Sequence, residues 1–168
     1  MLLLRYAALR LLAAMLLMQI CYSSISAQER SAGAFAAAAL KASLASQAKH
    51  HLAIHVDDND AKVMNLALNN ARNVIEYYGA KGEAVAIEIV TYGPGLHMLR
   101  ADTSPVKQRI GEMSIASEIS FSACGNTQAN MAKQEGSSVP IMSEARVVPS
   151  GVVRLIELQK VGYAYIRP

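Results

Sequence analysis

Apolar and polar residues alternate along the chain in blocks whose lengths are typical of strands and helices. Residues 51–56 form a short apolar run, which predicts a strand, and an acidic cluster at residues 57–60 follows it directly. Acidic side chains accept hydrogen bonds from the first amides of a helix and oppose its dipole. We therefore expect a helix from this cluster to about Tyr78, ending before Gly79. Its apolar stripe comprises Met64, Leu68, Ala71, Ile75 and Tyr78.

The rest of the chain repeats the order of strand and helix. Residues 84–92 are almost entirely apolar, as is typical of a strand covered on both faces in a parallel sheet. The elements expected after it are a short helical piece at 96–100, a helix at 106–117, a strand at 119–124, a flexible polar loop at 127–145, a strand at 146–148, a helix at 152–160 and a strand at 163–166. This alternation predicts an α/β fold, a three-layer sandwich with a mainly parallel sheet of about five strands.

The first 27 residues have the pattern of a secretory signal peptide. Arg5 and Arg10 precede an apolar stretch at residues 11–20, and small residues at 24–27 offer a cleavage site. The stretch is shorter than the roughly 20 residues that a membrane span needs. A lipid anchor on Cys21 would need a small residue at position 20, where Ile20 stands. We expect cleavage and export to the periplasm, with an uncleaved anchor or a lipid anchor as alternatives.

The domain organisation follows from this leader. Residues 28–49 are rich in alanine and predict a tether or weak helix, and residues 50–168 are expected to form one α/β domain with its own core. The formal charge of +3 includes Arg5 and Arg10 of the leader, so that the mature chain is close to neutral. We therefore expect no nucleic-acid partner and, after cleavage, no membrane contact.

Cys124 is the candidate for chemistry, because it is the only cysteine left after cleavage of the leader. It ends a predicted strand, and in open parallel sheets ligands bind beyond the carboxyl ends of the strands. A helix that starts after Gly125 would direct amides at the sulfur, lower the pKa of the thiol and favour the nucleophilic thiolate. The alternative is that Cys124 is a small buried apolar residue, as free cysteines often are.

Other strand ends could contribute to a binding pocket. Glycine lets backbone approach a ligand at Gly93, Pro94 and Gly95, whereas a plain tight turn is the alternative. Helix starts could hold a small anion through Gly125, Asn126, Thr127, Ser150 and Gly151, or these residues could simply cap helices. Asn70 lies on an apolar helix flank and could orient the glycine turn or an anion, or bond to backbone.

Metal and cofactor sites are not expected. His51 and His55 share one face of a strand but stand about 13 Å apart, too far for two zinc bonds of about 2 Å. A calcium loop that began at Asp57 would have Lys62 in place of the turn glycine and Leu68 in place of the bidentate acid. The chain contains neither a phosphate-binding loop nor a dinucleotide fingerprint, since Met98 stands where the third glycine would be.

Four blocks resemble the DsrE/DsrF-like family: residues 65–73, 92–95, 123–127, and the tail at 148–152 and 162–168. The resemblance covers residues 51–168 and implies a five-stranded α/β fold, a homo-oligomer (dimer, trimer or hexamer) and a persulfide on Cys124. It therefore implies an exported protein that carries or transfers sulfane sulfur, as a carrier or weak sulfurtransferase. The alternative is a non-catalytic small-anion-binding or assembly module in which Cys124 is structural.

Overall fold

The computed structural model describes residues 33, 36, 39–40, 43, 47–116 and 118–168, and the chain divides into two compact units. The first unit comprises residues 1–42, and the predicted signal peptide at 1–27 lies outside the described residues. Positions 33, 36, 39 and 40 are helical, in agreement with a weak helix in the alanine-rich segment. None of the helices described is long and apolar enough to cross a membrane.

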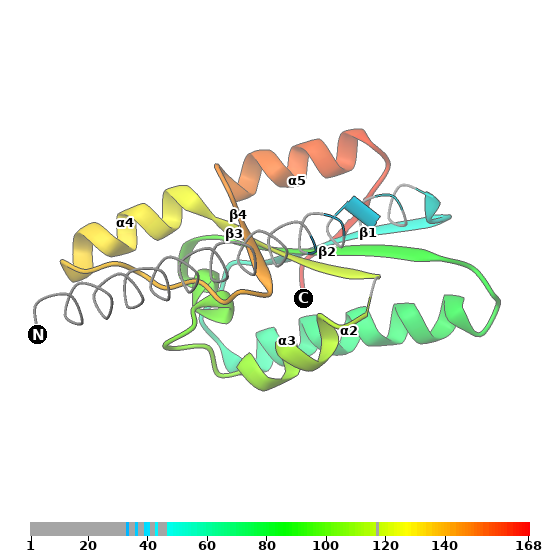
Figure 1. Ribbon diagram of the computed structural model, residues 1–168, viewed down its shortest axis with the longest axis horizontal. Helices are drawn as coiled ribbons and strands as arrows, with labels where there is room; N and C mark the ends of the chain where they lie inside the picture. Colours follow the sequence, from blue (N-terminus) through cyan, green and yellow to red (C-terminus); the bar gives the residue numbers. More distant parts are fainter. Residues whose placement is uncertain (1–32, 34–35, 37–38, 41–42, 44–46, 117) are drawn as a thin grey trace, which may run out of the picture. The chain divides into compact units, whose positions relative to one another are not determined.

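The second unit, Ser43–Pro168, contains a parallel five-stranded sheet. Its strands are β1 (His50–Val56), β2 (Val85–Thr91), β3 (Ile119–Cys124), β4 (Ala145–Val148) and β5 (Ala164–Ile166). They lie in the order β4-β3-β2-β1-β5, so β2 is central and the two shortest strands form the edges (Figure 1). The predicted α/β class with a five-stranded parallel sheet is confirmed.

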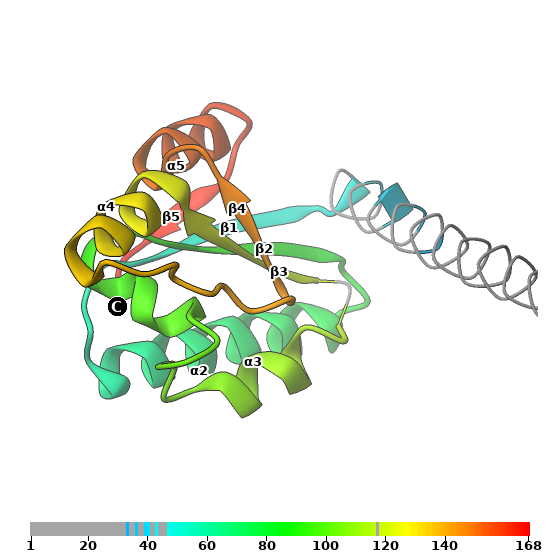
Figure 2. The same ribbon diagram turned by 60° about the vertical axis from the view of Figure 1, so that its left-hand side comes forward.

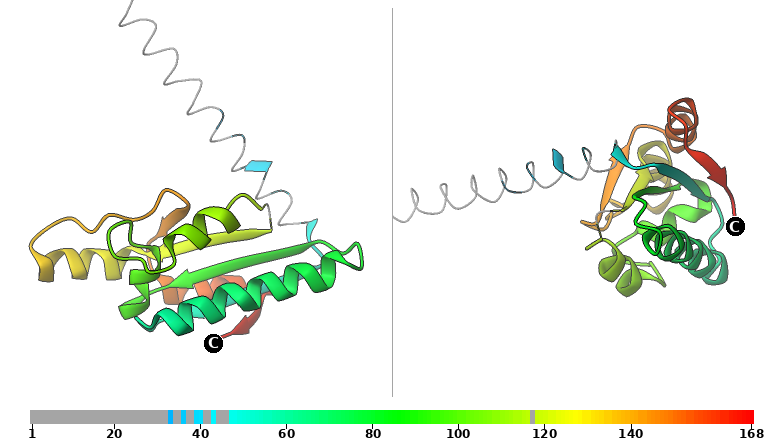
Figure 3. Two further views of the ribbon diagram at one scale, coloured as in Figure 1. Left: turned by 90° about the horizontal axis from the view of Figure 1, so that it is seen from below. Right: turned by 90° about the vertical axis from the view of Figure 1, so that its right-hand side faces the viewer.

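Helices cover both faces of this sheet and make a three-layer sandwich. Figure 2 shows α2 (Ala61–Gly79) and α3 (Lys107–Met113) on one face, and α4 (Gly125–Glu135) and α5 (Gly151–Lys160) on the other. The end-on view in Figure 3 separates the layers, with α2 and α5 on opposite sides of the strands. A 3₁₀ helix, η1 (Gly93–Leu99), follows the carboxyl end of β2.

The face covered by α2 and α3, here called the apolar face, contains the main core. Side chains alternate across a strand, so every second residue points toward these helices. On α2 the buried residues are Met64, Ala67, Leu68 and Ala71, three of which belong to the predicted stripe. They pack against strand residues that include Leu52, Ile54, Val56, Ile87, Ile89, Ile119 and Phe121.

The face covered by α4 and α5, here called the polar face, has a much smaller apolar cluster. That cluster consists of Ala53, Val90, Leu155 and Leu158, with Tyr92 and Tyr163 packed against it. The other buried strand residues on this face include His55, Glu88, Ser122 and Cys124. The buried ionisable residues of the strands, with the thiol of Cys124, therefore gather on one face.

Glu88 is held on the polar face by two arginines. Arg146 donates from Nη2 to both carboxylate oxygens at 2.8 Å, and Arg154 donates from Nε and Nη2 at 2.8 Å each. Ser122 Oγ adds a hydrogen bond to Oε1 at 2.6 Å. Burial raises the pKa of Glu88, but these hydrogen bonds outweigh it and hold the pKa below the ordinary value. The carboxylate therefore ties β2 to β3, β4 and α5.

Two predicted elements differ from the structure. The predicted loop at 127–145 is wrong in its first part, because α4 occupies Gly125–Glu135 and ends at Gly136, whose φ of 66° lies in the left-handed region. The helix predicted at 106–117 is shorter, and α3 spans Lys107–Met113. The first turn of α2 is capped as expected, by Asp60 Oδ1, which accepts from the amide of Lys62 at 2.7 Å.

Candidate functional site

Cys124 is both the last residue of β3 and the N-cap of α4. It is a free thiol and its residue is 4% exposed. The strand brings the side chain to the polar face, and the helix that begins at Gly125 places its first amides beside it. The position expected from the sequence, at a strand end before a helix, is therefore confirmed.

Four hydrogen-bond donors surround the sulfur of Cys124. Burial raises the pKa of this thiol, but the Thr127 hydroxyl and the amides of Gly151, Thr127 and Asn126 favour the thiolate, so that the net pKa lies below the ordinary value. Three of the donors belong to α4 and one to the first residue of α5. Two helix amino ends thus converge on one sulfur atom and stabilise negative charge there.

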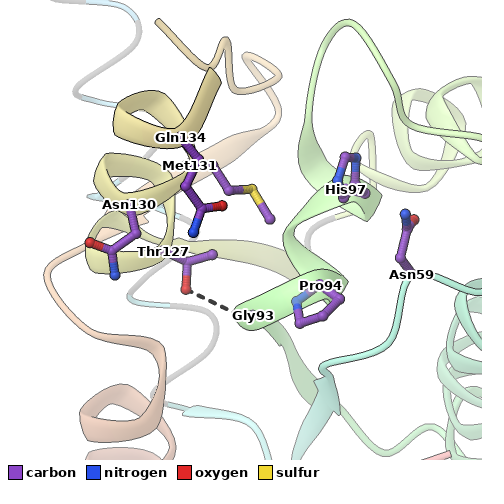
Figure 4. A pocket seen from close by; sticks show the side chains of 8 residues that line it. All are labelled: Asn59, Gly93, Pro94, His97, Thr127, Asn130, Met131 and Gln134. Carbon is purple, nitrogen blue, oxygen red and sulfur yellow. Dashed lines mark hydrogen bonds between the residues drawn. The ribbon is translucent and has the colours of Figure 1, made fainter. Parts of the chain in front are cut away.

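The orientation of the Thr127 hydroxyl is set by its other neighbour. Gly93 donates its amide hydrogen to Thr127 Oγ1 at 3.0 Å, the contact drawn as a dashed line in Figure 4. A hydroxyl that accepts this bond keeps its own hydrogen for a second partner. The turn at Gly93 therefore helps Thr127 to donate to Cys124.

The close approach of α5 to the sulfur depends on Gly151. A Cβ atom at this position would lie 3.0 Å from Tyr92 Cδ1 and 3.2 Å from Cys124 Cβ. At Gly125 a Cβ would lie 3.1 Å from the carbonyl oxygen of Val148. Because a Cβ atom at either position would be closer to its neighbours than side chains normally allow, these two glycines let β4 and α5 pack against the start of α4.

A row of aromatic and charged side chains continues from Cys124 across the strand ends. His55 is 3% exposed, stacks on Tyr92 with ring centroids 4.4 Å apart, and forms a 2.9 Å hydrogen bond between Nδ1 and the Tyr165 hydroxyl. Its Nε2 is buried without a hydrogen-bond partner, 3.9 Å from Asp57 Oδ2. Asp57 in turn accepts a 2.9 Å bond from Arg167 Nε.

The protonation of this row follows from its surroundings. Burial lowers the pKa of His55, and this effect outweighs the opposing charge of Asp57, so the imidazole is kept neutral. Burial, followed by the charge of Asp57, raises the pKa of Tyr92, so its phenol stays protonated. His55 and Tyr92 therefore form an uncharged aromatic wall beside Cys124.

A pocket of about 390 Å³ opens next to Thr127. It lies between α4, η1 and the loop that follows β1, and Figure 4 shows the α4 side chains on one side, with His97 and Asn59 on the other. The lining residues are Asn59, Gly93, Pro94, His97, Thr127, Asn130, Met131 and Gln134. None of them is an acid, a lysine or an arginine, so the pocket has no permanent side-chain charge.

Comparison with solved structures places the chain among known proteins. It is similar to a protein of unknown function, MTH1491, from Methanobacterium thermoautotrophicum, with 31% sequence identity and a TM-score of 0.60. The similarity covers 71% of this chain and 100% of the other. The chain belongs to the MTH1491 family. No family model matches it, and neither does any curated protein.

The fold of this MTH1491-family protein brings most of the predicted site residues together. Asn126, Thr127 and Gly151 contact the sulfur of Cys124, and Gly125 lets α4 start there. Gly93 and Pro94 line the pocket. Ser150 is the N-cap residue of α5, next to Gly151, but its side chain makes no capping hydrogen bond.

Two predicted site residues lie elsewhere. Asn70 is half-buried in the middle of α2, about 14 Å along the helix from Ala61, and so does not reach the strand ends. Gly95 is a buried residue of η1, where a Cβ would lie 2.2 Å from the carbonyl oxygen of Val56. Gly95 therefore serves the turn, which was the alternative interpretation of this glycine.

Sequence reasoning missed the row of His55, Tyr92 and Tyr165. His55 was considered only as a metal ligand, and within the described residues no group of three or more His, Cys, Asp or Glu side chains is placed to hold a metal ion. A usable signal was the alternation of side chains along a strand, because His55 is the penultimate residue of β1, Cys124 is the last residue of β3, and both point to the polar face. The pocket residues of α4 were missed with the helix itself.

Proposed function

We propose that this MTH1491-family protein is an exported, DsrE-like carrier of sulfane sulfur that holds a persulfide on Cys124. The observation that carries the proposal is the position of Cys124 at the end of β3 and the start of α4, against Gly151, the first residue of α5. The Thr127 hydroxyl and the amides of Asn126, Thr127 and Gly151 hold the pKa of the thiol below its ordinary value. Those donors favour the thiolate, which is the form that attacks sulfane sulfur, and they also suit the anionic persulfide that results. The DsrE-like pattern around residues 123–127 supports the same assignment.

The loading step conserves atoms and electrons. The Cys124 thiolate attacks the sulfane sulfur of a thiosulfonate, RSO₂S⁻, and a bond forms between Sγ and that sulfur. The bond between the sulfane and sulfonyl sulfur atoms breaks, and its electron pair leaves with the sulfinate, RSO₂⁻. The products are the Cys124 persulfide anion and the sulfinate, and transfer to an acceptor thiolate follows by the same type of attack.

Export and self-association complete the proposal. The leader pattern at residues 1–27 supports secretion to the periplasm. Apolar residues on the outer side of α5 support a homo-oligomer, since Val152, Val153 and Ile156 are 52%, 49% and 48% exposed. Dimers, trimers and hexamers are all compatible with a single apolar face of this kind.

One observation favours a second candidate, a non-catalytic small-anion-binding or assembly module. Cys124 is 4% exposed and lies against Gly151, as a packing residue would. In that case the donors hold the start of α4 together, and the thiol does not react in the folded protein.

Sulfur loading separates the two candidates. Purified protein is treated with a thiosulfonate, and its intact mass is measured before and after reduction. We expect a reductant-labile gain of one sulfur atom on the wild type and none on Cys124→Ser, whose fold is unchanged by circular dichroism. Equal uptake by both proteins, or alkylation of the wild-type thiol only after unfolding, would replace the carrier with the binding module.

A further inference from the structure

The pocket beside Thr127 has a chemistry of its own, which the persulfide proposal does not use. Three of its lining residues are amides, namely Asn59 from the loop after β1, and Asn130 and Gln134 from α4. All three residues are exposed, and in the part of the chain that the structure describes none of the three side chains hydrogen-bonds to another residue. Amide groups both donate and accept, so they are free to pair with a ligand that does the same.

The remaining lining residues favour an organic ligand over an inorganic anion. Pro94 and the thioether of Met131 offer apolar contact, and Figure 4 shows both beside the opening. An inorganic polysulfide or thiosulfate would meet no cationic lysine or arginine here. The volume of about 390 Å³ lies within the range of roughly 300 to 1,000 Å³ that small-molecule pockets occupy.

We propose that this pocket binds the uncharged, amide-bearing part of a small organic persulfide, such as an amide-capped cysteine persulfide, and presents its outer sulfur to Cys124. The identity of the delivered group rests on the proposed function, whereas recognition of the amide-bearing part does not. Thr127 joins the two sites, because it lines the pocket and also donates to the sulfur.

The transfer from such a donor is balanced without a further reactant. The Cys124 thiolate attacks the outer sulfur of RS–SH, and a new bond forms from Sγ. The sulfur–sulfur bond of the donor breaks, and its electron pair leaves as the thiolate RS⁻. Cys124 then carries the persulfide, and the product RS⁻ is released from the pocket.

Binding is tested with a ligand that cannot react. N-acetyl-S-methylcysteinamide carries two amides and a thioether, and nuclear magnetic resonance titration follows the amide signals of α4. We expect saturable shifts in the wild type and in Cys124→Ser. Gln134→Met and Asn130→Leu keep the side-chain volume but lose the amide, and each should weaken binding about fivefold. Gln108→Met, an equivalent change on α3, is the matched control and should have no effect.

Sulfur transfer is then compared for two donors, the persulfide of N-acetylcysteinamide and inorganic tetrasulfide. We expect the rate with the organic donor to saturate and to fall about fivefold in Gln134→Met, while the rate with tetrasulfide stays unchanged. Equal losses with both donors, or no saturable binding of the thioether, would overturn the pocket assignment and leave the persulfide proposal intact. Saturable binding that is sensitive to Gln134→Met without any sulfur uptake would support the pocket and overturn the persulfide carrier.

Discussion

The two faces of the sheet are built from alternate residues of the same strands, yet their chemistry is opposite. On β3 the consecutive residues Phe121 and Ser122 are both buried, and Phe121 enters the large core while Ser122 donates to Glu88. The same division holds on β2, where Ile87 and Ile89 flank Glu88. The apolar face therefore supplies most of the stability, and the polar face can hold charged and reactive groups without being the main core.

The largest expected effect is on the apolar face. Phe121→Ala removes a side chain that is 2% exposed and should cost about 4 kcal/mol of unfolding free energy, since it combines lost burial with a cavity. Urea unfolding at pH 7 measures it. Ser122→Ala, its neighbour on the opposite face, should cost only about 1 to 2 kcal/mol for the lost hydrogen bond. Equal losses of unfolding free energy at the two positions would contradict the claim that the apolar face supplies most of the stability.

The next effect tests the charged group of the polar face. Glu88→Gln leaves two arginines without their carboxylate and should cost about 2 to 3 kcal/mol at pH 7, because the carboxylate is buried but Arg146 can turn to solvent. Glu157→Gln, which removes an exposed contact to Arg154 alone, is the matched control and should change stability by less than about 0.5 kcal/mol.

The difference in unfolding free energy between wild type and Glu88→Gln should depend on pH, in a direction that the pKa of Glu88 sets. The folded-state pKa of Glu88 lies below its ordinary value of 4.5. The carboxylate therefore contributes its full stabilisation above pH 4.5, and this stabilisation is lost as the pH falls through the lower pKa of the folded state. Wild type and Glu88→Gln should therefore converge in stability in acid. A difference that grew as the pH fell below 4.5 would show that the arginines do not stabilise the carboxylate.

How much of this contrast is visible in the sequence depends on whether an element buries apolar residues. The continuous apolar run of β2 and the stripe of α2 were predicted with nearly correct bounds. By contrast, α4 was interpreted as a loop because none of its residues is buried, so it has no stripe to detect. Its polar surface lines the pocket, and Asn130, Met131 and Gln134 were missed for the same reason. The first residues of α4, up to Thr127, were predicted because the helix start after Cys124 is a local signal.

Contacts between distant segments could not be inferred from local patterns. His55 and Tyr165 are 110 positions apart and meet only because β5 pairs with β1, a neighbour relation that periodicity does not specify. Likewise Glu88 stands out as a charged residue in an otherwise apolar strand, but its arginines come from β4 and α5. Cys124 was found because its signals, a strand end followed by glycine and capping residues, are all local.

The smallest expected effect in free energy is the sharpest test of what the polar face does. Thr127→Val removes a hydroxyl that lowers the pKa of the Cys124 thiol, so it should raise that pKa, with about 1 kcal/mol lost in stability. The pH profile of alkylation by iodoacetamide measures this shift. Thr127→Ser retains the hydroxyl and should restore the profile, whereas a profile unchanged in Thr127→Val would remove Thr127 from the site.

The two tightest glycines impose different constraints on how sequences of this family can diverge. A side chain at position 95 would collide with the backbone of Val56, so replacement there is blocked whatever reaction a family member performs. At position 151 the clash is with Tyr92 and Cys124, which are side chains that can change. Replacement of the thiol alone would not relieve this contact, because the Cβ atom of Cys124 and the Cβ and Cδ1 atoms of Tyr92 lie against position 151. Gly95 is therefore fixed by the backbone of β1, whereas Gly151 is fixed by two neighbouring side chains.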